Sequence, residues 1–294
     1  MDIKDSKSRM ASGLGALLIT TLLWGTSFPA IKLATQSVDG ITYTWVRGVI
    51  SLAGLTPVVL YFLAKGKVRR DAIVGGLATG VVFALALWLQ GWGTSLTTAS
   101  NSAFITGLNV VIVYGIDALI KKEPYGLRGL ISLTLSVIGL YLISGGMSGV
   151  RIGDLLVLGS AFFAALQVEL IHKYSSSNPS VFVFFEMVPM SFFVVADMVR
   201  GFNWVGIAEA LPYLIYLGLV CNDVALAFQV YGQRHFRAYE AAVVYLLEPV
   251  SAAVFSYLVL GEVLTLKNYL GAALIVLAMA AVTVKVGGSE LKKV

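Results

Sequence analysis

The polar side chains best suited to bind a substrate or carry a proton lie inside long apolar runs. Glu248 follows Tyr245 by three residues, so both fall on one face of a helix, and Pro249 should bend that helix next to them. Glu248 would lie near the centre of a bilayer, where an ionised carboxylate costs about 2.5–3.5 kcal/mol to insert. Such a group can bind a substrate ammonium or carry a proton, or it can be a buried carboxyl bonded to its neighbours.

Two glutamines mark an internal repeat. Residues 86–93 read ALWLQGWG, and residues 225–232 read ALAFQVYG, 139 positions later and close to half the chain length. Gln90 and Gln229 would therefore lie at matching depths of two halves, which indicates a site that the halves share. Each glutamine could instead satisfy a backbone group where two helices touch.

A polar stripe extends from Gln229 along its helix. Asn222, Leu226, Gln229 and Gln233 follow each other at the spacing of one helical face, which is too polar to meet lipid. Asp223 stands beside this stripe and needs a partner or a wet cavity. We therefore expect this face to look onto water or substrate.

Other residues could complete such a cavity. Asn109 is the repeat counterpart of Glu248 and shares a helical face with Asn101. Four aromatic residues could stack against a flat or apolar substrate: Trp24, Tyr43, Trp88 and Trp92. Aromatics near span ends also form an interfacial belt, and we favour the belt for Trp92. The predicted substrate-binding residues are Trp24, Tyr43, Trp88, Gln90, Asn101, Asn109, Asn222, Asp223, Gln229, Tyr245 and Glu248.

The composition places these residues in a membrane. Hydrophobic residues make up 58% of the 294 residues and charged residues 13%, with a mean hydropathy of +0.86. A soluble domain carries about 25% charged residues, so this chain is expected to cross the membrane several times. The single cysteine, Cys221, excludes internal disulfides and a cysteine-built metal site. Catalytic, phosphate-binding and metal-binding motifs are absent from the sequence, so we expect no catalytic residues, no metal and no cofactor.

The apolar runs predict ten transmembrane helices, since a span needs about 20 mostly apolar residues. These spans are Leu14–Ala34, Ile41–Leu63, Ala72–Trp92, Ala99–Ile120, Leu127–Ser144, Gly153–Ile171, Val181–Val199, Pro212–Gln233, Ala238–Leu260 and Lys267–Val286.

The basic residues of the connections orient the spans. Nearly all lie on the side that holds both termini, and the opposite side has only Arg151, Arg200 and Lys267. Positive residues stay on the cytoplasmic side, which predicts cytoplasmic N- and C-termini. The net charge of +5 then faces anionic lipids rather than nucleic acid.

Ten spans in two copies give five to each, over residues 1–146 and 147–294. Because five is odd, the second copy enters the membrane in the opposite direction. The predicted fold is therefore an all-α integral membrane protein of ten transmembrane helices, arranged as two inverted five-helix repeats around a central cavity. Alternating-access carriers have this architecture.

Arg47 and Glu186 are also repeat partners, 139 positions apart. Inverted halves would place them at opposite depths, which argues against a direct ion pair. Arg47 could bind a substrate carboxylate or anchor a structural network, and we favour the network.

Several motifs together resemble the drug/metabolite transporter superfamily, in its EamA-like branch with ten transmembrane helices. They are WGTSFPAIK at 24–32, Arg47 in the next span, ASNSAFITGL at 99–108 running to Glu123, and AAVVYLLEPV at 241–250 running to Glu262. Within this superfamily, the chain is most similar to bacterial exporters of aromatic amino acids. The resemblance implies export of amino acids or related metabolites, with helices one to four and six to nine around the cavity. The second copy departs from the opening motif at 164–173, which breaks the symmetry of the first and sixth helices.

We therefore expect a secondary transporter, not an enzyme, in the bacterial cytoplasmic membrane, exporting aromatic and other small amphipathic amino acids by alternating access. A cationic or sugar-like solute on the same fold is the first alternative. An integral-membrane enzyme is the second, and it would need paired acid/base or metal residues that the sequence lacks. The expected partners are the lipid bilayer and a small-molecule substrate, with protons as a candidate coupling ion, and the expected state is a monomer or weak dimer.

Overall fold

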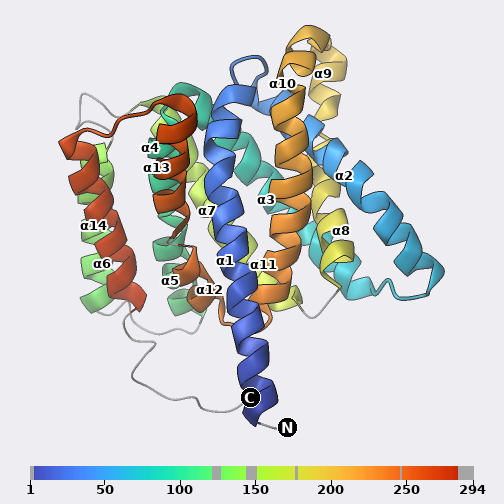
Figure 1. Cartoon of the computed structure of the whole chain (residues 1–294), viewed down its shortest axis with the longest axis horizontal. Coiled ribbons are helices and arrows are strands. Elements are labelled where there is room, and N and C mark those ends of the chain that lie inside the picture. The colour runs from blue at the N-terminus through green and yellow to red at the C-terminus, as the bar shows by residue number, and fades with distance from the viewer. Residues whose placement is uncertain (1–2, 121–126, 144–150, 176–177, 246, 284–294) are drawn as a thin grey trace.

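Figure 1 shows a computed structural model of the chain, which describes residues 3–120, 127–143, 151–175, 178–245 and 247–283. Across these residues the regular structure is helical, as the apolar runs predicted. The first half contains α1 (Ile3–Ala34), α2 (Gly40–Ala64), α3 (Arg70–Leu96), α4 (Ala99–Thr106), α5 (Asn109–Ile120) and α6 (Leu127–Ile143). The second half contains α7 (Ile152–Tyr174), α8 (Pro179–Ser191), α9 (Val194–Arg200), α10 (Trp204–Tyr216), the π-helix η1 (Leu217–Val224), α11 (Ala225–Gln233), α12 (Ala238–Val244), α13 (Leu247–Leu260) and α14 (Leu266–Thr283).

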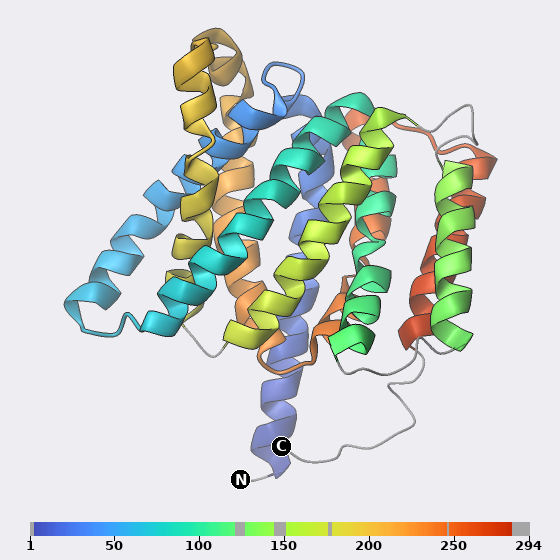
Figure 2. The ribbon, with the colours of Figure 1, turned by 180° about the vertical axis from the view of Figure 1, so that it is seen from behind.

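Eight stretches of the described residues are long and apolar enough to cross a membrane. They correspond to eight of the predicted spans, and several of them combine two shorter helices, such as α8 with α9. The remaining two predicted spans correspond to α6 and α14, which pack against each other at one side of the bundle (Figures 1 and 2). Over the described residues neither meets the length and hydropathy of a span, so the count of ten stays a prediction.

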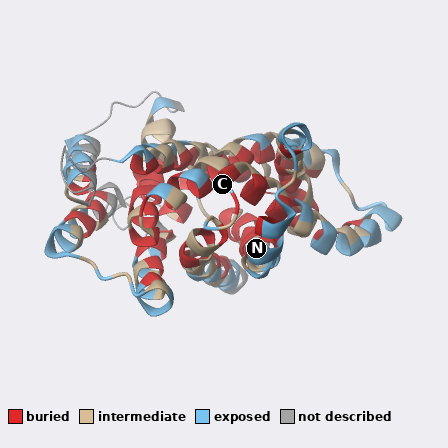
Figure 3. Cartoon of the chain, turned by 90° about the horizontal axis from the view of Figure 1, so that it is seen from above, coloured by how far each residue is buried: buried red, intermediate tan, exposed pale blue. Residues whose placement is uncertain are grey.

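The surface of the bundle is apolar where lipid would touch it. Figure 3 shows buried residues along the middle of the bundle and exposed ones around the rim and at the ends of the helices. Large apolar side chains point outward from the rim, among them Leu60, Leu63, Val195 and Val254. Soluble monomers rarely expose apolar surface on this scale, so the pattern supports a bundle surrounded by hydrocarbon.

Helix contacts recur with the two halves exchanged. α1 packs on α11 and α13, while its counterpart α7 packs on α3 and on α4 with α5. α2 packs on its own counterpart α8, α4 on α13, and α6 on α14. Figure 2 shows that α1 and α7 run in opposite directions through the bundle. An inverted repeat produces this exchanged pattern of contacts.

Two spans are interrupted at corresponding places in the two halves. α4 ends at Thr106 and α5 begins at Asn109, while α12 ends at Val244 and α13 begins at Leu247. Pro249 accounts for the second break, because its ring would clash with the carbonyl of Tyr245 in a continuous helix. A Cβ on Gly107 would lie 3.4 Å from Pro249 Cγ, so the two breaks face each other. Discontinuous helices at matching positions indicate a binding site between the repeats.

Glycines bring α3 and α8 into backbone contact. A Cβ on Gly80 would lie 2.3 Å from the Glu186 carbonyl oxygen, which cannot rotate away. We expect Gly80→Ala to destabilise the protein by about 1–3 kcal/mol or more, as overpacking does. The melting temperature in detergent should fall, and Gly15→Ala is the matched control, since nothing lies within 4 Å of a Cβ there. Equal melting temperatures for the two variants would contradict this close approach.

Candidate functional site

A cavity of about 50 Å³ lies where the two helix breaks meet α1, α2, α3 and α7. Apolar side chains form part of its wall, and five larger polar or charged side chains reach it: Arg47, Gln90, Asn109, Gln167 and Glu248. Pockets for small ligands usually measure about 300–1,000 Å³. The cavity must therefore widen to accept a substrate.

Arg47 brings a buried positive charge to this cavity, with only 2% of the residue exposed. Its guanidinium donates hydrogen bonds to the side-chain oxygens of Tyr43 and Asn222. A longer contact of 3.4 Å reaches the Leu217 carbonyl, and Nε has no partner. No carboxylate among the described residues lies within ion-pairing distance of Arg47. A buried cation without a counter-ion costs several kcal/mol, which an anionic ligand group would offset.

The π-helix η1 supplies acceptors to the first half. The Leu217 carbonyl accepts from the Arg47 guanidinium, and the Cys221 carbonyl accepts from Trp24 Nε1 at 3.2 Å. The α-helical spacing expected across this span is therefore wrong for Leu217–Val224, which includes Asn222.

Glu248 faces the same cavity from the first turn of α13 and is 5% exposed. Its backbone N–H donates to the Tyr245 carbonyl at 3.0 Å, a tightened turn that marks the break. The Glu248 carboxylate has neither a hydrogen bond nor an ion pair among the described residues. In the part of the chain that the structure describes, the cavity thus holds a guanidinium and a carboxylate that have no ion-pair partner.

Gln167 links the cavity to a second buried polar cluster. Its Nε2 donates to Glu186 Oε1 at 3.0 Å and to Gln229 Oε1 at 3.1 Å, and Gln229 Nε2 donates back at 3.1 Å. Glu186 is fully buried, and its Oε2 has no partner. Arg47 and Glu186 do not form an ion pair. This cluster fixes the orientation of the Gln167 amide at the cavity wall.

The structure divides the predicted binding residues into those at the cavity and those elsewhere. Trp24, Gln90, Asn109 and Glu248 line it. A second group lies directly behind the wall: Tyr43 and Asn222 hold Arg47, Gln229 holds Gln167, and Tyr245 packs on Trp24 with ring centroids 5.4 Å apart.

Three predicted residues lie away from the cavity. Trp88 is stacked on Trp92 and contacts Phe193, with ring centroids 5.9 and 5.7 Å apart. The Asp223 carboxylate accepts a hydrogen bond from Ser51. Asn101 lines a separate pocket at the end of the bundle.

Sequence reasoning missed several lining residues with polar side chains. Ser27 and Thr106 line the cavity and stand inside the WGTS and ASNSAFIT motifs, so the motifs carried a signal for them. Ser160 and Gln167 both come from α7. Gln167 falls in the stretch 164–173, where the second copy departs from the first, so the repeat comparison gave no indication of it.

The end of the bundle at which α3 ends and α7 begins, here termed the outer end, is closed by contacts between the halves. Asp197 on α9 accepts hydrogen bonds from Thr42 at 2.6 Å and from Trp45 at 2.7 Å. Arg200 pairs with Asp39 at 2.7 Å. Partial burial pushes the pKa of Asp39 upward, but the bonds from Arg200 and from the Thr42 backbone outweigh it, so the pKa lies below its ordinary value. These contacts join the start of α2 in the first half to α9 in the second half.

Comparison with known proteins agrees with this architecture. The model of the EamA-like transporter family matches the chain twice, over residues 11–145 and 151–284. The chain belongs to this family. An uncharacterized transporter of Archaeoglobus fulgidus is 32% identical over 286 residues, which cover 96% of this chain and 89% of the relative.

Other relatives of this EamA-family chain are more distant. The uncharacterized transporter YwfM of Bacillus subtilis is 23% identical, with 91% of this chain and 92% of YwfM covered. The uncharacterized inner membrane transporter YicL of Salmonella typhimurium is also 23% identical, with 90% and 92% covered. A crystal structure at 15% identity aligns with a TM-score of 0.68, over 94% of this chain and 97% of that one, which shows a shared fold. The protein is a multi-pass membrane transporter.

Proposed function

We propose that this transporter exports amino acids and recognises their zwitterionic group between Arg47 and Glu248. One observation carries the proposal: both side chains line the same buried cavity, and among the described residues neither has an opposite charge within ion-pairing distance. A substrate carboxylate would bind the guanidinium, and a substrate ammonium would bind the Glu248 carboxylate. A zwitterion thus satisfies both groups at once.

The rest of the wall suits an apolar side chain. Trp24, Phe83 and Leu87 line the cavity, and they could pack on an aliphatic or aromatic substrate once the cavity has widened. A sugar-like solute would leave both charges without partners, and a cationic solute would satisfy only Glu248 beside the Arg47 cation. These costs favour an amino acid over the other solute classes.

Alternating access is the mechanism that fits the paired halves. Residues 1–146 and 147–294 would rock about the central cavity, and the outer-end contacts of Asp197 and Arg200 would break when the substrate leaves. In the proposed orientation both termini are cytoplasmic and the protein lies in the cytoplasmic membrane. Export then runs from the side of the termini toward the outer end.

Transport of labelled amino acids by proteoliposomes tests this function. We expect saturable counterflow for amino acids with apolar or aromatic side chains, and no counterflow for a sugar or a quaternary ammonium solute. An imposed pH gradient in the same vesicles distinguishes proton-coupled flux from simple equilibration. Absence of flux for every amino acid, in vesicles that transport another solute class, would reject the proposal.

A further inference from the structure

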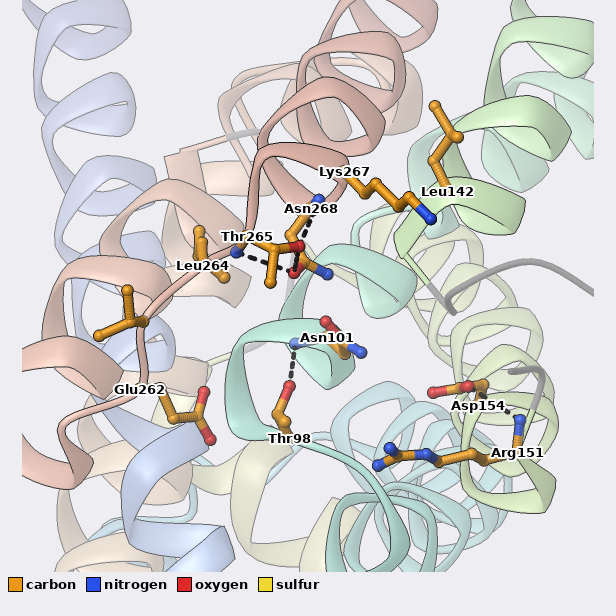
Figure 4. A pocket seen from close by; sticks show the side chains of 11 residues that line it. Thr98, Asn101, Leu142, Arg151, Asp154, Glu262, Leu264, Thr265, Lys267 and Asn268 are labelled. Atoms are coloured by element: carbon orange, nitrogen blue, oxygen red, sulfur yellow. Dashed lines mark hydrogen bonds between the residues drawn. The ribbon is translucent and has the colours of Figure 1, made fainter. Parts of the chain in front are cut away.

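A second, larger pocket of about 470 Å³ opens at the outer end, between the α6–α14 pair and helices α4 and α7 (Figure 4). None of its lining residues belongs to the central cavity. Its volume lies within the range typical of ligand pockets, about 300–1,000 Å³. It is therefore a separate candidate site.

Two cations, Arg151 and Lys267, line this pocket. Arg151 comes from the N-cap of α7 and Lys267 from the first turn of α14, and Figure 4 shows Arg151 near Asp154 and Lys267 near Leu142. Neither side chain has a hydrogen bond or an ion pair among the described residues. Their charges are available to a ligand.

The acidic residues of the pocket are already engaged. Asp154 accepts from Thr97 Oγ1 at 2.8 Å and from the Arg151 backbone N–H at 3.1 Å. Glu262 accepts from the backbone N–H groups of Ala99 and Ser100 at 2.8 and 2.9 Å, which caps the N-terminus of α4. Both carboxylates keep their negative charge but hold neighbouring donors, so the charged groups of the described lining that remain for a ligand are the cations Arg151 and Lys267, which favours an anionic ligand group.

Its surroundings add to this preference and indicate the source of the ligand. Both α7 and α14 begin at the pocket, so their positive dipole ends favour an anion there. Leu142 and Val263 form apolar parts of its wall, and Val263 is 78% exposed. The pocket lies where spans begin and end, which is the depth of lipid headgroups.

We propose that this pocket binds the phosphate group of an anionic phospholipid. Arg151 and Lys267 would contact the phosphate oxygens from α7 and α14. The acyl chains would leave over the apolar side chains of Leu142 and Val263. Such a lipid would tie this peripheral pair to the rest of the bundle.

Native mass spectrometry and thermal unfolding test the proposal with the full-length protein in phosphatidylcholine nanodiscs containing increasing phosphatidylglycerol. We expect one tightly retained phosphatidylglycerol and a melting temperature that rises with its fraction. In Arg151→Gln/Lys267→Gln, the affinity for the retained lipid should be about twentyfold to thirtyfold weaker, because each basic residue adds to the free energy of binding to an anionic lipid. Lys65→Gln/Lys67→Gln removes two exposed cations from the opposite end and should keep the retained lipid.

Charge-preserving variants and free phosphate complete the test. Arg151→Lys/Lys267→Arg should retain the lipid, because it keeps both charges. Stabilisation by inorganic phosphate in detergent, lost in the Arg151→Gln/Lys267→Gln variant, would support the anion site and identify soluble phosphate as its source. Wild-type lipid retention and melting behaviour in Arg151→Gln/Lys267→Gln, or equal losses in the charge-preserving variant, would overturn the proposal.

Discussion

Arg47→Gln should raise the KM for amino acid export by about thirtyfold or more while the protein remains folded. Removing one partner of a buried, hydrogen-bonded charge pair costs about 2–5 kcal/mol, and each 1.4 kcal/mol is about tenfold in affinity. Glutamine still offers an N–H donor to Asn222, and it removes a buried charge that has no carboxylate within ion-pairing distance among the described residues. Initial rates in proteoliposomes measure the KM, and unfolding in detergent measures the stability.

Substrate analogues separate a binding role for Arg47 from a structural one. The wild type should prefer an amino acid to the amine formed by removing its carboxylate, and Arg47→Gln should lose that preference. Arg47→Lys keeps the positive charge but lacks the planar guanidinium that binds a carboxylate with two hydrogen bonds. It should therefore recover part of the preference for the amino acid over the amine. A variant that melts earlier and transports both solutes equally slowly would assign Arg47 to the structural network that the sequence favoured.

Eight spans could be predicted from the sequence because lipid imposes one simple requirement on length and polarity. The π-helix η1 could not. An α-helix and a π-helix have the same apolar composition, and the choice here depends on contacts between η1 and distant residues such as Arg47 and Trp24. These contacts form only in the folded bundle.

Site residues could be predicted from the sequence where a polar residue stands inside an apolar span. Glu248, Gln90 and Asn109 were predicted because a polar side chain inside an apolar span is costly unless it meets a polar partner or a cavity. All three line the cavity. Trp88 gives no such signal, because an aromatic residue is equally compatible with a cavity, a helix contact or the membrane interface. It packs against Phe193, outside the cavity lining.

Glu248→Gln should produce the complementary loss to Arg47→Gln. Without the carboxylate, a substrate ammonium has no opposite charge, so KM for amino acids should rise by about thirtyfold, on the same 2–5 kcal/mol basis. Transport of the matching acid that lacks the amino group should change little. Glu186→Gln is the matched control, because it alters a buried carboxyl outside the cavity lining and keeps an acceptor for Gln167. It should leave the preference for the amino group unchanged.

The same variant tests whether Glu248 carries a proton instead. In that case wild-type flux would follow an imposed pH gradient, and Glu248→Gln would lose this response while it kept its preference for the amino group. Because Arg47 lies on α2 and Glu248 on α13, a zwitterion bound to both would bridge the two halves. The loss of binding free energy in Arg47→Gln/Glu248→Gln should then be smaller than the sum of the losses in the two single variants, because either substitution alone already breaks the bridge. Strictly additive losses would mean that the two residues bind independently, and the bridge that couples substrate binding to the rocking of the halves would not exist.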